Sequence, residues 1–151
     1  MPIILSQSRL ETRKIAAVLA KEIMQKPPKI NSALVLALSG DLGAGKTTFT
    51  QSFIKNFGVK KRITSPTFLL FRPYKIKNKN YKLIYHIDCY RIQKPKDLLD
   101  LGLKEILSNR RYIVLIEWPE KIRKFLPKNV IWIKFQHGKK ENERMIKIII
   151  K

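Results

Sequence analysis

The 151-residue sequence predicts an α/β fold, a three-layer arrangement in which helices cover a mixed sheet with a parallel core and antiparallel hairpin additions. Three observations predict this class. Residues 32–40 and 112–118 are short, continuous apolar runs, as expected of strands buried on both faces of a parallel sheet. Segments with helical spacing stand between strand-like runs. Two pairs of strand-like runs are separated by polar stretches, which is typical of hairpins.

The first element is an amphipathic helix over residues 6–25. Ser8 and Glu11 have the Ser-x-x-Glu spacing of a capping box, which satisfies free backbone N–H groups at a helix start. Pro27 and Pro28 end the helix, because proline cannot continue it. The apolar stripe predicted to face the core consists of Leu10, Ile15, Val18, Leu19 and Ile23.

The middle of the chain continues with a strand, a helix and a hairpin. The strand at 32–40 is followed by a helix from Lys46 to about Asn56, which Gly58 is placed to stop. Strand-like runs at 67–74 and 81–90 then flank a polar stretch, so they are expected to pair as a hairpin.

The last part of the chain is predicted to form a helix, a strand and a closing hairpin. The helix covers 97–107, with Gly102 weakening its middle. The strand at 112–118 is the second member of the central parallel pair. Runs at 129–135 and 144–150 form the closing hairpin.

Length and composition limit the class of protein. A chain of 151 residues with 44% hydrophobic residues suits one folded domain, residues 1–151. No apolar run approaches the ~20 residues that span a bilayer, and the N-terminus lacks a signal-peptide pattern. Cys89 is the only cysteine, which excludes an internal disulfide. We therefore expect a cytoplasmic protein that does not contact membranes.

The charge is extreme, with 32 Lys and Arg against 11 Asp and Glu, a formal net charge of +21. One interpretation is contact with RNA or another anion. The other is AT-rich coding DNA, because Lys, Ile and Asn are all abundant and the basic residues are spread along the chain. Net charge bears on association rather than on fold, so both interpretations stay open.

Residues Gly40 to Thr47 fit the pattern G-x-x-x-x-G-K-[ST], between a predicted buried strand and a predicted helix. Glycines allow successive backbone N–H groups to point into one concavity, and the helix N-terminus adds partial positive charge. Lys46 would then contact the β- and γ-phosphates, and the Thr47 hydroxyl would bind Mg²⁺. The alternative is an ordinary glycine turn. The context favours a P-loop NTPase-like fold that binds a nucleotide together with Mg²⁺.

A P-loop enzyme also needs an acidic group at the end of a neighbouring strand. Asp88 and Glu117 both end predicted strands, at the sheet edge where α/β folds bind ligands. Either acid could instead be a helix cap or part of a surface ion pair.

Three other features leave alternatives open. Residues 63–68, "ITSPTF", could form a loop that senses the γ-phosphate or a bland turn. His86 could be a ligand or a base, although a lone histidine facing a core is more often structural. Trp118 could belong to the core, cover the site or contact a partner.

Taken together, the motifs resemble the TsaE family of small bacterial P-loop ATPases. The matching segments are "SGDLGAGKTTFTQ", "SPTF", "HIDCYRI", "DLLDLGLKEIL" and "IEWPEK", in the order and at the spacing of the family. The resemblance implies a Mg²⁺-dependent ATPase that takes part in making N6-threonylcarbamoyladenosine in tRNA. It implies binding to the transferase pair TsaB–TsaD, which ATP hydrolysis keeps cycling, and at most an indirect contact with tRNA.

The resemblance also assigns residues. Thr47 and Glu117 would hold Mg²⁺, while Asp88 and Lys46 would serve hydrolysis, and "SPTF" and the stretch around Asp88 would be switch segments. The base would lie near Glu11 or Thr12 and near Gly138. The nucleotide-binding set is Thr12, Leu42, Gly43, Ala44, Gly45, Lys46, Thr47, Thr48 and Gly138. The chain has Gly138-Lys139 where the family often has Gly-Arg, and lysine lacks the planar fork of arginine.

Two rival functions remain. A small nucleotide or nucleoside kinase would share the P-loop, but the sequence has no arginine-rich lid insertion, and Arg110 and Arg111 lie on the wrong side of a strand. An RNA-binding module with a vestigial P-loop would not need the intact Lys46 and Thr47. No arginine follows the P-loop at a spacing that would let this chain itself stabilise the negative charge of the transition state. We therefore expect slow intrinsic hydrolysis that a partner stimulates.

Overall fold

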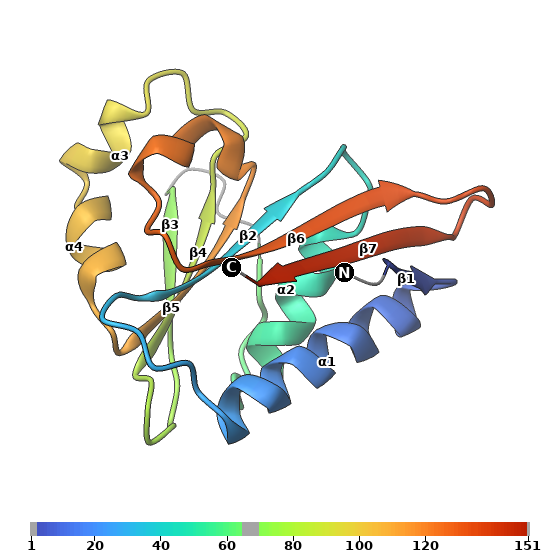
Figure 1. Cartoon of the computed structure of the whole chain (residues 1–151), viewed down its shortest axis with the longest axis horizontal. Helices are drawn as coiled ribbons and strands as arrows, with labels where there is room; N and C mark the ends of the chain where they lie inside the picture. The colour runs from blue at the N-terminus through green and yellow to red at the C-terminus, as the bar shows by residue number, and fades with distance from the viewer. Residues whose placement is uncertain (1–2, 65–69, 151) are drawn as a thin grey trace.

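Seven strands form one mixed sheet in the order β1-β7-β6-β2-β5-β4-β3 (Figure 1). The computed structural model describes residues 3–64 and 70–150. The strands are β1 (Ile3–Ser6), β2 (Leu34–Ser39), β3 (Phe71–Lys75), β4 (Leu83–Asp88), β5 (Tyr112–Glu117), β6 (Val130–His137) and β7 (Arg144–Ile150). The helices are α1 (Arg9–Gln25), α2 (Lys46–Lys55), α3 (Lys96–Asp100), α4 (Leu103–Ser108) and the 3₁₀ helix η1 (Pro119–Phe125).

The sheet has a parallel centre and antiparallel edges, which confirms the predicted fold class. The strands β6, β2, β5 and β4 are parallel neighbours, so the parallel core is wider than the expected central pair. The predicted hairpins are present as the antiparallel pairs β3–β4 and β6–β7. β1 adds an edge strand on β7 that the sequence did not predict, since four residues carry too weak a pattern.

Helices cover both faces of the sheet, which gives three layers (Figure 1). Side chains alternate along a strand, so β2 sends Leu34, Leu36 and Leu38 to the core beneath α1 and α2. Val35 and Ala37 face the opposite core, beneath α3, α4 and η1. A strand buried on both faces must be apolar at every position, which explains the continuous run in the sequence.

The helix α1 has the predicted cap at Ser8 but begins at Arg9 rather than at residue 6, and it buries only part of the predicted stripe. The Ser8 hydroxyl accepts a hydrogen bond from the Glu11 N–H at 3.1 Å, which caps the helix. Leu10 and Val18, predicted to be buried, are 57% and 64% exposed, so this part of the stripe was wrong. The buried positions of α1 are Thr12, Ala16, Ala20 and Ile23. The small alanine side chains leave room for α2, whose Ser52 donates to the Arg13 carbonyl at 2.8 Å.

Glycine divides the helix predicted at 97–107. Gly102 has φ +98°, a left-handed conformation that interrupts the helical backbone and separates α3 from α4. The start of the first predicted hairpin, residues 67–69, lies outside the described residues, as does the whole "SPTF" segment, residues 65–68. Within residues 3–64 and 70–150, no helix is both long and apolar enough to cross a membrane.

Candidate nucleotide-binding site

The glycine-rich loop joins the carboxyl end of β2 to the start of α2, the position that the sequence predicts. Gly40 lies against β6 so closely that a Cβ there would stand 2.5 Å from the Phe135 carbonyl oxygen. Gly45 has φ +106° and immediately precedes α2. Both positions therefore require glycine, one for close approach and the other for its backbone conformation. The loop leads into the N-terminus of α2, which favours anions.

Lys46 is the first residue of α2 and is 5% exposed. Its ammonium group donates to the carbonyl oxygens of Gly40 and, at 3.1 Å, Asp41. The nitrogen also lies 4.0 Å from the centre of the Trp118 ring, within range of a cation–π interaction. Burial lowers the pKa of Lys46, while nearby carboxylates, with Glu117 the strongest, oppose this shift. The charge of Lys46 is thus held by polar neighbours rather than by bulk water.

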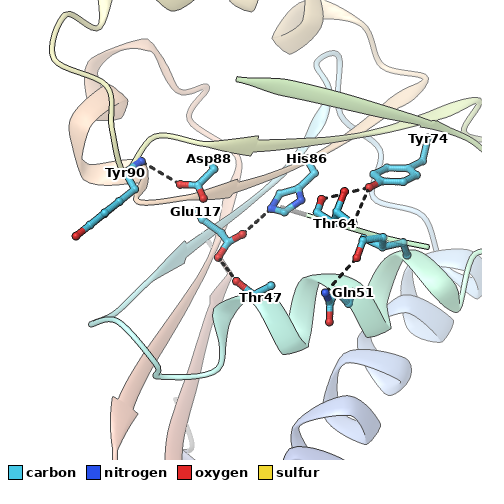
Figure 2. Close-up of polar contacts among 9 residues, drawn as sticks. Thr47, Gln51, Thr64, Tyr74, His86, Asp88, Tyr90 and Glu117 are labelled. Atoms are coloured by element: carbon cyan, nitrogen blue, oxygen red, sulfur yellow. Dashed lines mark hydrogen bonds and ion pairs between the residues drawn. The ribbon is translucent and has the colours of Figure 1, made fainter. Parts of the chain in front are cut away.

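Glu117 lies at the centre of a buried hydrogen-bond network (Figure 2). The Thr47 hydroxyl, on α2, donates to Oε1 of Glu117 at 3.0 Å. Nε2 of His86, on β4, lies 2.5 Å from Oε2. Glu117 is 3% exposed and His86 is fully buried. The network therefore connects α2, β5 and β4 through one carboxylate.

The hydroxyl and the carboxylate fit the donor set of a magnesium ion. Both Thr47 and Glu117 present oxygen atoms, and Mg²⁺ prefers oxygen ligands. Mg²⁺ commonly takes one or two protein side chains and fills its other positions with phosphate oxygens and water. The 3.0 Å hydrogen bond places these two groups together at the end of the glycine-rich loop. They are the residues that would hold the ion.

Asp88 lies beside Glu117, because β4 and β5 pair in a register that puts these two residues opposite each other. Its Oδ1 accepts a hydrogen bond from the Tyr90 N–H at 2.9 Å. Burial raises the pKa of Asp88, the Tyr90 N–H opposes the shift, and the charge of Glu117 adds to it. The two acids thus differ in their surroundings. Glu117 accepts a hydrogen bond from the Thr47 side chain, whereas Asp88 accepts one from a backbone N–H two residues further along the chain.

A cleft of about 550 Å³ opens over the loop and the two acids. Of the predicted site residues, it is lined by Thr12, Leu42, Gly43, Ala44, Gly45, Lys46, Thr47, Thr48, Asp88 and Glu117. The Thr12 hydroxyl lies 2.7 Å from the Ser6 hydroxyl, and its methyl group lies 3.8 Å from where a Cβ of Gly45 would stand. Trp118 also lines the cleft. The sequence alone allowed three roles for this residue, in the core, as a cover of the site or as a contact with a partner.

The structure does not bring Gly138 to the cleft wall. Its N–H donates to the Glu143 carbonyl at 2.8 Å within the β6–β7 turn, and a Cβ there would stand 2.5 Å from the Cβ of Glu143. The glycine therefore serves the turn. The same turn contributes Glu141, Asn142 and Arg144 to the cleft instead.

Arg144 is a site residue that the sequence analysis missed. Its Nε and Nη2 donate to the Gly43 carbonyl at 3.2 and 2.9 Å, and Nη1 donates to the carbonyls of Glu141 and Glu143. Nε2 of His137 lies 3.3 Å from the Leu42 carbonyl oxygen. The β6–β7 hairpin therefore braces the phosphate loop. No local signal marks this contact, since the pairing of β6 with β2 creates it.

His86 was interpreted as either functional or structural, and its contact with Glu117 places it at the site. The segment at 63–68 can be followed only to Thr64. There, Gln51 of α2 donates to the Ile63 carbonyl at 3.1 Å, and the Tyr74 hydroxyl lies 3.4 Å from both N and O of Thr64 (Figure 2). The γ-phosphate role of residues 65–68 falls outside the described residues.

Known proteins are similar to this chain in sequence and in fold. The model of the family described as "Threonylcarbamoyl adenosine biosynthesis protein TsaE" matches residues 6–146. The tRNA threonylcarbamoyladenosine biosynthesis protein TsaE of Rickettsia felis is 40% identical over 140 residues, which cover 92% of this chain and 74% of that protein. The protein of the same name in Haemophilus influenzae is 36% identical over 125 residues, covering 83% and 73%.

A solved structure agrees with the sequence relatives. The crystal structure of YdiB from Bacillus subtilis has a TM-score of 0.70 and 30% identity to this chain. The match covers 97% of this chain and 83% of the YdiB chain. The family model spans nearly the whole sequence, and the TsaE relatives are matched over about three quarters of their length. This chain therefore belongs to the TsaE family of threonylcarbamoyl adenosine biosynthesis proteins.

Proposed function

We propose that this protein is a Mg²⁺-dependent ATPase, slow by itself, that binds the TsaB–TsaD pair and keeps that transferase cycling by hydrolysing ATP. The observation that carries the proposal is the hydrogen bond between the Thr47 hydroxyl and the Glu117 carboxylate beside the phosphate loop. A loop threonine and an acid at the end of a neighbouring strand are the protein groups that hold Mg²⁺ in P-loop NTPases. Membership of the TsaE family gives the biological setting.

Each residue at the site has a role in this proposal. Mg²⁺, when bound, would neutralise negative charge on the β- and γ-phosphates. Lys46 would exchange the carbonyl oxygens of Gly40 and Asp41 for phosphate oxygens. Asp88 would orient the attacking water, and the raised pKa of its carboxyl suits a group that accepts a proton.

Two observations support dependence on a partner. Arg144 donates four of its five N–H groups to backbone carbonyls, so it braces the loop rather than offering its charge to a phosphate. Leu42 and Tyr90 line the cleft yet are 65% and 44% exposed, which leaves apolar surface that a partner could cover. A partner would then complete the site, as arginine donors in trans do for GTPases.

The test is steady-state phosphate release with Mg²⁺ or with EDTA, with and without purified TsaB–TsaD. We expect slow release that needs Mg²⁺ and rises by an order of magnitude or more with the pair, since a catalytic arginine in trans contributes about 10³–10⁵ in GTPases. Lys46→Ala should remove most of this activity in a folded protein, because it deletes the charge that meets the phosphates.

Other outcomes would favour the rival functions. Fast release that the pair leaves unchanged would contradict partner dependence. Transfer of phosphate to an added nucleoside would instead identify a kinase. Absence of turnover with an active TsaB–TsaD preparation would favour an RNA-binding module with an inactive loop.

A further inference from the structure

The buried histidine of β4 has no role in the mechanism proposed above. We infer that His86 is a positioning residue for the magnesium site, holding the Glu117 carboxylate in the orientation that lets it and the Thr47 hydroxyl bind one metal ion. The inference rests on the proposed function, because it concerns the metal of the same site. It adds a residue that touches neither nucleotide nor metal but determines how the acid is presented.

The geometry fixes both oxygens of the carboxylate. Oε1 of Glu117 accepts from Thr47 at 3.0 Å, and Oε2 lies 2.5 Å from Nε2 of His86 (Figure 2). The two partners come from different elements, one from α2 and one from β4. A carboxylate with a single partner can rotate about its terminal torsion, which is broad and soft. With a partner on each oxygen, that rotation is prevented.

The hydrogen-bond network assigns the proton of His86. An ionised carboxylate only accepts, so Nε2 must carry the hydrogen. Nδ1 of His86 is then a lone pair, and it has no partner among the described residues. An unpartnered lone pair in a buried place costs less than an orphaned N–H, which makes this tautomer the consistent one.

This same unpartnered nitrogen argues against a purely structural histidine. His86 is fully buried, and Ile84, two residues earlier on the same face of β4, is an apolar residue in the core. An apolar side chain at position 86 would avoid the cost of burying a polar atom that lacks a partner. Among the residues that the structure describes, the hydrogen bond to Glu117 is the contact that makes an imidazole useful here.

Loss of the His86 donor would free Glu117 to turn toward Lys46. Lys46 and Glu117 line the same cleft, and Glu117 is the carboxylate that most opposes the lowering of the Lys46 pKa by burial. A direct pair between them would withdraw the acid from the metal and the ammonium from the phosphates. Outer-shell donors of this kind typically contribute about 10- to 100-fold to metal affinity.

The experiment compares substitutions that keep or remove a donor at the Nε2 position. In His86→Gln, the side-chain amide extends far enough to donate in place of Nε2, whereas in His86→Asn it is too short. His86→Leu removes the donor and keeps the bulk. Ile87→Val, on the opposite face of β4, is the control for disturbance of the strand. The affinity for ATP is measured by calorimetry in EDTA and across a Mg²⁺ titration.

We expect His86→Asn and His86→Leu to leave ATP affinity in EDTA nearly unchanged and to raise the Mg²⁺ concentration at half-saturation about 10- to 100-fold. His86→Gln should stay within a few-fold of the unmodified protein, as should Ile87→Val. If His86→Leu does not fold, the comparison between Gln and Asn answers the same question, because both are amides and differ in reach.

Two results would overturn the inference, and they are distinguishable. If Asn and Gln shift the Mg²⁺ requirement equally, or neither shifts it, His86 does not position the carboxylate although the metal site stands. If the unmodified protein binds ATP no more tightly with Mg²⁺ than with EDTA, the proposed metal site itself fails, and the role of His86 fails with it.

Discussion

Lys46, Asp88 and Glu117 are ionisable residues of the same cleft, and each has different polar partners. Lys46 lies between loop carbonyls and the ring of Trp118. Glu117 takes hydrogen bonds from two side chains, while Asp88 has the backbone N–H of Tyr90. Trp118 is the only described non-glycine residue with positive φ, at +58°, an unusual conformation for a bulky side chain. Such strain is common at functional sites.

Asp88→Asn should raise thermal stability while slowing hydrolysis. Burial raises the pKa of Asp88, so its ionised form costs folding free energy at neutral pH. The asparagine keeps the acceptor for the Tyr90 N–H and removes the charge. The gain in Tm should be complete above the raised pKa and should shrink as the pH falls toward the ordinary pKa of a carboxyl, below which Asp88 is protonated in both folded and unfolded states.

Thermal denaturation at several pH values and single-turnover hydrolysis test this expectation. We expect single-turnover hydrolysis to fall about 10²-fold or more, in line with removal of a general base. A lower Tm of the variant at neutral pH would show that the ionised carboxylate of Asp88 does not cost stability. Unchanged hydrolysis would show that this carboxylate has no role in catalysis.

At the scale of elements, the β6–β7 hairpin forms a wall of the phosphate loop. Gly40 packs on the backbone of β6, and the carbonyls of Leu42 and Gly43 meet His137 and Arg144. These contacts fix carbonyl groups on the outside of the loop. The N–H groups of the loop are thereby held ready to receive a phosphate, which lowers the ordering cost of binding.

Arg144→Ala should therefore weaken ATP binding by about tenfold, through faster dissociation, because a charge-assisted hydrogen bond contributes about 1.5–3 kcal/mol and part of this is recovered by water. Arg144→Lys should recover only part of the affinity, since one ammonium cannot reproduce the fork. Stopped-flow dissociation of a fluorescent ATP analogue measures the effect. Arg110→Ala, beside Asn31 and Glu105 in a separate shallow depression, is the control and should behave as the unmodified protein.

The sequence predicted the elements whose signals are local. The strands β2 and β5 are continuous apolar runs, and the loop before α2 has a fixed motif, so these and the acids at strand ends were found. The strand β1 and the helix η1 were missed, because one is four residues long and the other has no amphipathic repeat. Arg144 was missed because 101 residues separate it from Gly43, and only the sheet brings them together.

The whole molecule carries its acids unevenly. Three of the 11 acidic residues, Asp88, Glu117 and Glu141, line the cleft, while the net charge of the chain is +21. A protein with this charge attracts any polyanion at low salt, and that attraction carries no sequence information.

We therefore expect unmodified tRNA and a random RNA of equal length to bind equally at low salt. Both affinities should fall about 10³-fold or more between 50 and 200 mM salt, as when six or more phosphates are neutralised. Fluorescence anisotropy with labelled RNAs at several salt concentrations measures this. A preference for tRNA that persists at physiological salt would contradict a composition-driven charge and show a direct tRNA contact.

The alternation of side chains along β4 has a further consequence for which changes of length the chain tolerates. His86 lies on the α2 face, Ile87 belongs to the opposite core, and Asp88 returns to the cleft. Deleting one residue of β4 before His86 would reverse the faces of the residues that follow. The side chains of His86 and Asp88 would then point toward α3, and Ile87 would lie beside Glu117. The same deletion at the tip of the β3–β4 hairpin, residues 77–80, would leave the core unchanged, because the core contacts of the turn come from Ile76 and Tyr81 on either side of that tip. Variation in length should therefore be confined to the turns, and the strand ends that carry the acids should keep a constant residue count.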